Sequence, residues 1–243
     1  MICLDFDGVL FDTANEAFII GSKAFFGHEA IFDNSKVNYK RFLLLRPFID
    51  SAWQYHKVFE LLIDDLSDKD ILIKGRQVLK QQIGAEDREF AVKFHSYRNE
   101  LLKNNFTKWV DLNKPYEFFH HLKPLLIKFP SKFYICSTKS SDFISEILYF
   151  NGVNFDIKRI WGRESFEANN DSKAEILENK FNTAEEILFV DDSPRHIMDV
   201  QRLKNVNAIL AKWGYIETGK VCDNNAIIIE KIRDKLDNND NKN

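Results

Sequence analysis

Long apolar runs and basic clusters are both missing from this sequence of 243 residues. No uninterrupted apolar run approaches the roughly 18 residues that a membrane-spanning helix needs, and we expect no signal peptide ahead of the first apolar segment. No block of lysine and arginine of the kind that binds nucleic acid is present, and the net charge is only −3. We therefore expect a cytoplasmic protein that binds neither membranes nor nucleic acids.

Cysteine is scarce as well. The three cysteines are an odd number, which argues against a disulfide framework, and their spacing fits no zinc site. Cys3 and Cys136 lie in apolar, strand-like runs, which favours buried thiols. Hydrophobic residues, by contrast, make up 44% of the chain and include 22 phenylalanines. This composition can fill a core, and the length suits a core with an inserted module.

The chain begins with a short apolar run that ends in acidic residues. The run stops at Asp5, a second carboxylate follows at Asp7, and Gly8 permits a tight turn that a Cβ would obstruct. Side chains alternate along a strand, so Asp5 and Asp7 are predicted to share one side. Carboxylates placed so close repel each other, and either a bound cation or a raised pKa would relieve the repulsion.

Further along the chain, two more strand-like runs end in polar residues. Residues 132–136 are followed by Ser137 and Thr138, and residues 186–190 are followed by Asp191 and Asp192. Strands and helices alternate here, which predicts an α/β core with a parallel sheet. In such sheets ligands bind at the carboxyl edge of the strands, so these polar side chains are expected to converge there.

A lysine that precedes the strand-like run 186–190 occupies an electrostatically unfavourable position in a predicted helix. Ser172 and Glu175 form a capping-box pattern, which places Lys173 in the first turn of a helix. A cation there opposes the helix dipole, which indicates that Lys173 has another duty. Arg163 and Lys180 are the alternatives for this role.

The region between the first and second strand-like runs has a different character. From about residue 42 to residue 103 the pattern is helical, with no alternating strand signal. We predict a core domain of residues 1–13 and 112–236, an α-helical insertion of residues 14–111 and a disordered tail of residues 237–243. Within the insertion, Arg46 is the slight favourite for a substrate contact, because Pro47 can begin a helix and leave Arg46 at a loop edge.

Together these motifs resemble the four signature motifs of the haloacid dehalogenase (HAD) superfamily, in its phosphatase form with an α-helical cap. The resemblance implies a Rossmann-like parallel-sheet core, with Asp5 as the nucleophile that forms an aspartyl-phosphate and Asp7 as the general acid and base. It also implies that Ser137, with Thr138 beside it, binds the phosphoryl group, and that Lys173 neutralises charge. Many relatives place Pro after this lysine, whereas this chain has Ala174.

The resemblance also implies a magnesium site. Asp192 corresponds to the principal ligand of the fourth motif, Asp191 stands where a Gly is common, and Asp5 and Asp7 complete the set. Oxygen-only ligands suit Mg²⁺ better than Zn²⁺. Where relatives often carry a second acid, four positions after Asp192, this chain has His196.

We therefore expect a Mg²⁺-dependent phosphatase that acts on a small phosphorylated metabolite, as a monomer or homodimer. Asp7 argues against a halide-releasing enzyme. A phosphomutase remains open, as does a phosphonate hydrolase that uses Lys23, Lys36 or Lys40, and so does a non-catalytic binding protein with the same fold. The sequence does not name the substrate.

Overall fold

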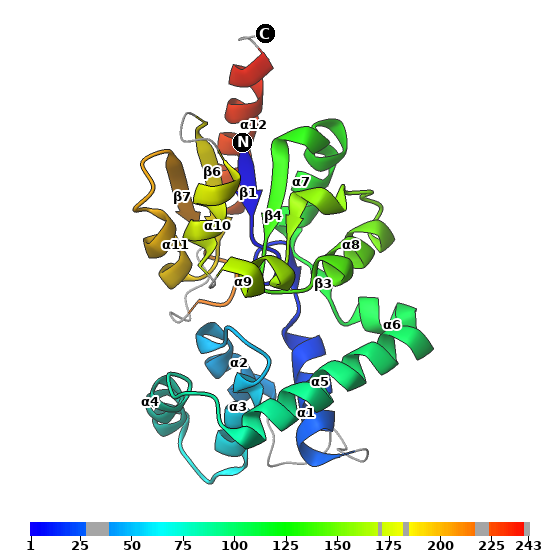
Figure 1. The fold of residues 1–243 in the computed structure, drawn as a ribbon, viewed down its shortest axis with the longest axis vertical. Coiled ribbons are helices and arrows are strands. Elements are labelled where there is room, and N and C mark those ends of the chain that lie inside the picture. Colours follow the sequence, from blue (N-terminus) through cyan, green and yellow to red (C-terminus); the bar gives the residue numbers. More distant parts are fainter. Residues whose placement is uncertain (28–38, 170–171, 182–184, 217–223, 241–243) are drawn as a thin grey trace. The chain divides into compact units, whose positions relative to one another are not determined.

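A computed structural model describes residues 1–27, 39–169, 172–181, 185–216 and 224–240 (Figure 1). The chain divides into two compact units. Met1–Asp12 together with Lys114–Asn243 form what we call the core unit, and Thr13–Asn113 form the inserted unit. Of the helices in the described ranges, none combines the length and the hydrophobicity that a membrane crossing requires.

The core unit is built on a five-stranded sheet of order β5-β4-β1-β6-β7, in which every pair of neighbours is parallel. Its strands are β1 (Ile2–Leu4), β4 (Phe133–Cys136), β5 (Ile160–Trp161), β6 (Ile187–Asp191) and β7 (Val206–Leu210). In the centre of the sheet, Leu4 of β1 is in register with Ile135 and Val190. The three central strands therefore end at one edge, and the predicted α/β parallel-sheet fold is confirmed.

Helices complete the core unit. They are α7 (Glu117–Lys128), α8 (Ser141–Phe150), α9 (Arg163–Asn169), α10 (Lys173–Lys180), α11 (Pro194–Val200) and α12 (Asn225–Asp240), with short 3-10 turns η2 (Pro130–Lys132) and η3 (Ile157–Arg159). One face of the sheet contributes Cys3 and Phe189 to a hydrophobic cluster with Leu177 of α10 and Val200 of α11. Helices α9, α10 and α11 lie in front of the sheet in Figure 1. Both predicted buried thiols are free and buried.

A proline inside a helix usually kinks or ends it, but α7 continues through Pro124 to Lys128. The buried face of α7, with Phe118 and Leu122, stabilises the helix despite the missing N–H of proline. In addition, α12 includes residues 237–240, which were expected to be disordered; residues 241–243 lie outside the described residues.

The inserted unit contains only helices among its described residues. They are α1 (Ala14–Phe26), α2 (Tyr39–Leu45), η1 (Arg46–Phe48), α3 (Gln54–Ile63), α4 (Asp68–Val78), α5 (Ala85–Asn104) and α6 (Phe106–Asp111). Its core is rich in aromatic rings, with Phe18, Tyr55, Phe59 and Phe94 each within stacking or edge-to-face distance of a neighbouring ring.

A buried carboxylate joins three helices of the inserted unit. Thr13 and Glu16 form a capping-box pattern in the sequence, but the Thr13 side chain makes no cap hydrogen bond. Glu16, whose side chain is buried, instead accepts hydrogen bonds from Arg98 Nε (2.6 Å) and Nη2 (2.7 Å) and from Trp109 Nε1 (3.2 Å). Glu16 therefore links α1 to α5 and α6.

The two segments that lead to and from the insertion pair with each other. Strand β2 (Phe11–Asp12) and strand β3 (Lys114–Pro115) form an antiparallel ribbon in which Asp12 is opposite Lys114. The hydroxyl of Tyr215 donates a hydrogen bond to Asp12 Oδ1 (2.7 Å). The boundary of the core unit is thus held by the segment after β7.

Candidate active site

Asp5 lies at the centre of the candidate site because the middle strand of the sheet, β1, ends just before it. Its N–H still donates to Val190 O (2.9 Å), so the residue stays at the carboxyl edge of the sheet. Asp5 is only 6% exposed, and its Oδ1 accepts a hydrogen bond from the N–H of Phe6 (2.7 Å). A buried carboxylate at the edge where parallel sheets bind ligands marks a candidate active site.

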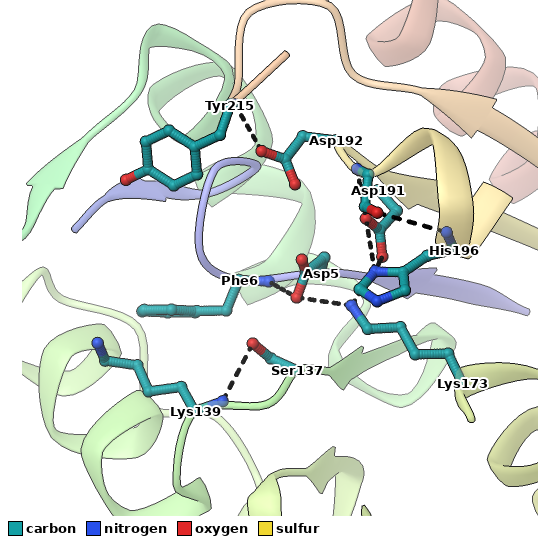
Figure 2. A network of polar contacts seen from close by, with 10 residues as sticks. Asp5, Phe6, Ser137, Lys139, Lys173, Asp191, Asp192, His196 and Tyr215 are labelled. Atoms are coloured by element: carbon teal, nitrogen blue, oxygen red, sulfur yellow. Dashed lines mark hydrogen bonds and ion pairs between the residues drawn. The ribbon is translucent and has the colours of Figure 1, made fainter. Parts of the chain in front are cut away.

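Lys173 connects Asp5 to the end of the neighbouring strand β6. Its Nζ lies 3.0 Å from Asp5 Oδ1 and 2.7 Å from Asp191 Oδ2, and all three side chains are buried (Figure 2). The predicted capping box is confirmed: the Ser172 hydroxyl accepts from the N–H of Glu175 (3.1 Å), so α10 starts at Lys173. One buried ammonium therefore neutralises part of the charge of two carboxylates.

Burial and charge set the protonation states of these three groups. Burial raises the pKa of Asp5 to about 6; Lys173 opposes this rise and Asp191 adds to it. Burial alone would lower the pKa of Lys173, but Asp191 and Asp5 raise it well above its usual value. Burial would likewise raise the pKa of Asp191, but Lys173 and His196 hold it well below its usual value. The expected repulsion from Asp7 also raises the pKa of Asp5, but by less than burial and Asp191 do.

Asp191 is further held by the start of α11. Its Oδ1 accepts a hydrogen bond from the N–H of Ser193 (2.8 Å), and His196 Nδ1 lies 3.2 Å from both carboxylate oxygens. Ser followed by Pro is a sequence pattern that predicts a cap and a first helical residue; accordingly, Ser193 caps α11 through the N–H of His196, and Pro194 is the first residue of the helix. The imidazole of His196 thus stands beside the carboxylate that Lys173 contacts.

Asp192 is fixed by a different set of neighbours. Its Oδ2 accepts a hydrogen bond from the N–H of Tyr215 (2.6 Å). Gly8 has a φ of +81° and packs so closely on this carboxylate that a Cβ would clash with Oδ2; a Cβ at Gly214 would clash with Asp192 and with the backbone of Gly8. The turn after β1 and the segment after β7 therefore enclose Asp192.

Ser137 follows β4, the other neighbour of β1. Its N–H donates to Trp161 O (3.1 Å), and its hydroxyl accepts from the N–H of Lys139 (3.5 Å). Ser137 is buried, whereas Thr138 is exposed. The hydroxyl that the sequence predicts as a phosphoryl ligand thus lies just after the end of β4, the strand next to β1.

Lys139, a buried cation, also lies in this region, although no motif in the sequence marks it as a site residue. Its Nζ lies 3.4 Å from Asp7 Oδ1. That oxygen is buried and accepts no hydrogen bond from the described residues. Asp7 and Lys139 therefore form an ion pair without a hydrogen bond.

The donor atoms fit a hard cation in part. Among the described residues, Asp5, Asp191 and His196 each offer a ligand atom within 4.8 Å of the others. Asp7 adds a buried oxygen with unused acceptor capacity. These carboxylate oxygens suit Mg²⁺, although an imidazole nitrogen is not a typical Mg²⁺ ligand. The ligand set predicted from sequence, which includes Asp192, stays a prediction.

The other predicted residues lie elsewhere. Arg46 is in η1 of the inserted unit, where its Nη1 donates to Ile49 O (3.2 Å); its contact with a substrate stays a prediction. Of the alternatives to Lys173, Lys180 is exposed at the far end of α10 and Arg163 begins α9. Lys23, one of the lysines considered for phosphonate chemistry, is ion-paired with Glu100 (3.3 Å); Lys36 lies outside the described residues.

Lys139 was missed as part of this cluster, and His196 was noted without a role being assigned to it, although both carried a signal in the sequence. Lys139 follows Ser137 by two residues, and a lysine in a buried strand-end segment is unusual. His196 occupies the position where relatives often carry an acid. Neither signal specifies the contact that the residue makes.

Comparisons with known proteins rest on structure. No protein-family profile and no curated protein matches the chain. A candidate phosphoglycolate phosphatase from Lactobacillus delbrueckii subsp. bulgaricus is 15% identical to it with a TM-score of 0.60, and the match covers 95% of this chain and 97% of that one. A predicted phosphoglycolate phosphatase from Haemophilus somnus is 19% identical with a TM-score of 0.56, and the match covers 91% of this chain and 88% of that one. A haloacid dehalogenase-like hydrolase from Streptococcus pneumoniae is 15% identical with a TM-score of 0.52, and the match covers 94% of this chain and 89% of that one.

Identities this low establish similarity of fold and leave activity open. The matched regions nevertheless span nearly the whole of each chain. The parallel sheet centred on β1, with an acidic residue at its carboxyl edge, agrees with this similarity. We conclude that the chain has the fold of the haloacid dehalogenase superfamily of hydrolases.

Proposed function

We propose that the protein is a Mg²⁺-dependent phosphatase that hydrolyses a small phosphomonoester through an aspartyl-phosphate on Asp5. The observation that carries this proposal is the buried contact of Lys173 with Asp5 and Asp191 at the carboxyl edge of the sheet. A cation fixed against a buried carboxylate offsets the charge that an incoming phosphoryl group adds. The phosphatase names of the structural neighbours support the same reaction class.

The first step is attack by Asp5. Both the N–H of Phe6 and the ammonium of Lys173 engage Oδ1, so Oδ2 is the candidate attacking atom. Oδ2 forms a bond to phosphorus, the bond from phosphorus to the ester oxygen breaks, and Asp7 gives a proton to the departing alcohol oxygen. Ser137, with the neighbouring Thr138, binds oxygens of the phosphoryl group during transfer.

The second step returns the enzyme to its starting state. A water attacks phosphorus, Asp7 accepts the proton from that water, and inorganic phosphate leaves as the Asp5 carboxylate is restored. Bound Mg²⁺, held by Asp5, Asp7, Asp191 and Asp192, would supply further stabilisation of charge on the phosphoryl group. Lys173 remains paired with Asp191 throughout, which keeps its charge in place.

The remaining parts of the proposal concern the insertion and the partners. We infer that the inserted unit acts as a cap that excludes water during transfer and that its residues, Arg46 among them, contact the substrate. The substrate is a small phosphorylated metabolite, and neither a membrane nor a nucleic acid takes part. The protein acts as a monomer or homodimer.

The test is phosphate release from a panel of small phosphate esters, with Mg²⁺ and with a chelator. Phosphoglycolate belongs in the panel because two structural neighbours bear that name. We expect release that needs Mg²⁺ and falls at least about 10³-fold in Asp5→Asn, because the amide cannot form the covalent intermediate.

Asp234→Asn is the matched control, because it makes the same change of charge at an exposed position of α12, outside the site. Substantial activity in Asp5→Asn would contradict the nucleophile assignment. If no ester releases phosphate but a sugar phosphate is isomerised, the protein is a mutase on the same core.

A further inference from the structure

Lys139 has more hydrogen-bonding capacity than the described structure uses. Its side chain is only 3% exposed, and the contact of its ammonium with the described residues is a 3.4 Å ion pair with Asp7 Oδ1, an oxygen that accepts no hydrogen bond. A buried ammonium normally has its protons taken by acceptors. Its unused donors point to an anionic ligand.

The backbone holds this lysine where it is. The N–H of Lys139 donates to Ser137 Oγ (3.5 Å) and its carbonyl accepts from the N–H of Arg163 (3.0 Å). The side chain therefore starts from a segment fixed between the end of β4 and the start of α9. The position of Lys139 beside Asp7 is therefore set by the packed backbone of the core unit, in contrast to an exposed lysine whose side chain is free to move.

The two buried lysines of the site, Lys139 and Lys173, contact different carboxylates. Lys173 contacts Asp5 and Asp191, whereas Lys139 contacts Asp7. In Figure 2 the two ammonium groups lie on opposite sides of Asp5 and Ser137. In the proposed reaction Asp7 faces the departing oxygen, so a cation next to Asp7 lies on the side of the leaving group.

We propose that Lys139 binds a second anionic group on the leaving-group part of the substrate. The preferred substrate is then a phosphomonoester that carries a carboxylate or a second phosphate close to the ester oxygen. This inference rests on the proposed phosphatase function, since the side of the leaving group is defined by the role of Asp7. A planar carboxylate or a phosphate can each accept from an ammonium.

The test compares esters that differ only in the second anion. Phosphoglycolate carries a carboxylate, ethane-1,2-diol bisphosphate carries a phosphate, and ethyl phosphate carries neither. Wild type should prefer one of the first two, which also identifies the anion. Lys139→Met should raise KM for that ester by about 10- to 100-fold more than it raises KM for ethyl phosphate, the effect of losing a charged hydrogen bond to the second anion. Lys139→Arg should recover much of the loss.

Lys158→Met is the matched control, because Lys158 is an exposed lysine of the core unit. Circular dichroism and thermal unfolding establish whether each variant folds. If Lys139→Met does not fold, Lys139→Gln takes its place. Equal preference of wild type for all three esters would overturn the proposal. So would an equal loss on all three esters in Lys139→Met, because Lys139 would then act through Asp7 or the fold.

Calorimetry on the Asp5→Asn protein separates this inference from the proposed function. In that background the esters bind without turnover, so affinity is measured directly. Tighter binding of the doubly anionic ester that disappears with Lys139→Met supports the anion contact even if wild type releases no phosphate. Identical affinities with and without Lys139 would refute the contact while phosphate release that depends on Asp5 still stands.

Discussion

At the scale of single residues, the charge of Asp5 is opposed by its surroundings. Burial raises its pKa to about 6, and the nearby ammonium of Lys173 compensates only in part because Asp191 shares that ammonium. Groups held in an unfavourable protonation state are common where proteins carry out chemistry, since reactivity and stability have different requirements. The metal-free protein should therefore be less stable when Asp5 is ionised.

This argument predicts that Asp5→Asn stabilises the metal-free protein at neutral pH. The carboxyl has a pKa of about 6 when folded and an ordinary value of 3.8. Between these values the folded state holds a proton that the unfolded state has lost, so stability falls as pH rises from about 4 to about 6. Asn behaves as the neutral carboxyl, and its advantage at pH 7 should reach up to about 3 kcal/mol.

The measurement is urea unfolding of both proteins in chelator at pH 4 and pH 7. The advantage of Asn should be large at pH 7 and small at pH 4. Loss of the Asp191 contribution at acid pH is common to both proteins and cancels in the difference. A wild type that is the more stable protein at pH 7 would contradict the account of Asp5.

At this scale the sequence predicted Asp5, Ser137 and Lys173 as site residues because each follows a recognisable strand or helix signal. Lys139 could not be chosen in the same way. A lysine beside a strand end is usually solvated, and only the packing around the end of β4 shows that this one is buried. His196 is similar, since its contact with Asp191 depends on how α11 leaves the strand.

At the scale of elements, caps and strand ends were predictable and tertiary contacts were not. The capping box of Ser172 and the cap at Ser193 were both confirmed, because capping depends on residues three positions apart. Glu16 shows the limit of the same pattern. It stands three residues after Thr13, yet its carboxylate bonds to Arg98 and Trp109, far along the chain. A buried guanidinium competed successfully with a local backbone donor.

The buried pair of Glu16 and Arg98 gives a prediction for the inserted unit. Arg98→Met alone removes the bidentate partner of a fully buried carboxylate and should destabilise the protein by about 3 to 5 kcal/mol. Glu16→Gln with Arg98→Met removes both charges and should recover much of that loss, because no unpaired charge remains.

Urea unfolding of the two single variants and the double variant completes a double-mutant cycle. Lys93→Met is the control, since Lys93 is an exposed lysine on α5 that pairs with Glu89 at the surface. Strictly additive effects of the two changes would show that the buried pair does not couple α1 to α5.

At the scale of the whole molecule, the order of the motifs along the chain was more informative than overall similarity. No protein-family profile matches, and the three solved structures named above are only 15% to 19% identical to this chain. The parallel sheet and its polar carboxyl edge were nevertheless predictable, because strand runs that end in Asp, Ser and Asp recur in a fixed order.

Boundary segments were less accessible to prediction. The paired linkers β2 and β3 are two residues each, too short to give a periodic signal. Their pairing, and the bond from Tyr215 to Asp12, arise only when segments far apart in sequence meet. The same holds for Gly8 and Gly214, whose close approach to Asp192 depends on three separate segments.

The central claim is that Asp5 carries the phosphoryl group, and one measurement tests it directly. Wild type and Asp5→Asn are mixed with a ³²P-labelled ester that wild type hydrolyses, quenched in acid within one turnover and digested. We predict a label on the peptide that contains Asp5 in wild type, released by hydroxylamine as an acyl phosphate is, and no label in Asp5→Asn. Rapid turnover with no labelled peptide, or a label on another residue, would contradict the account.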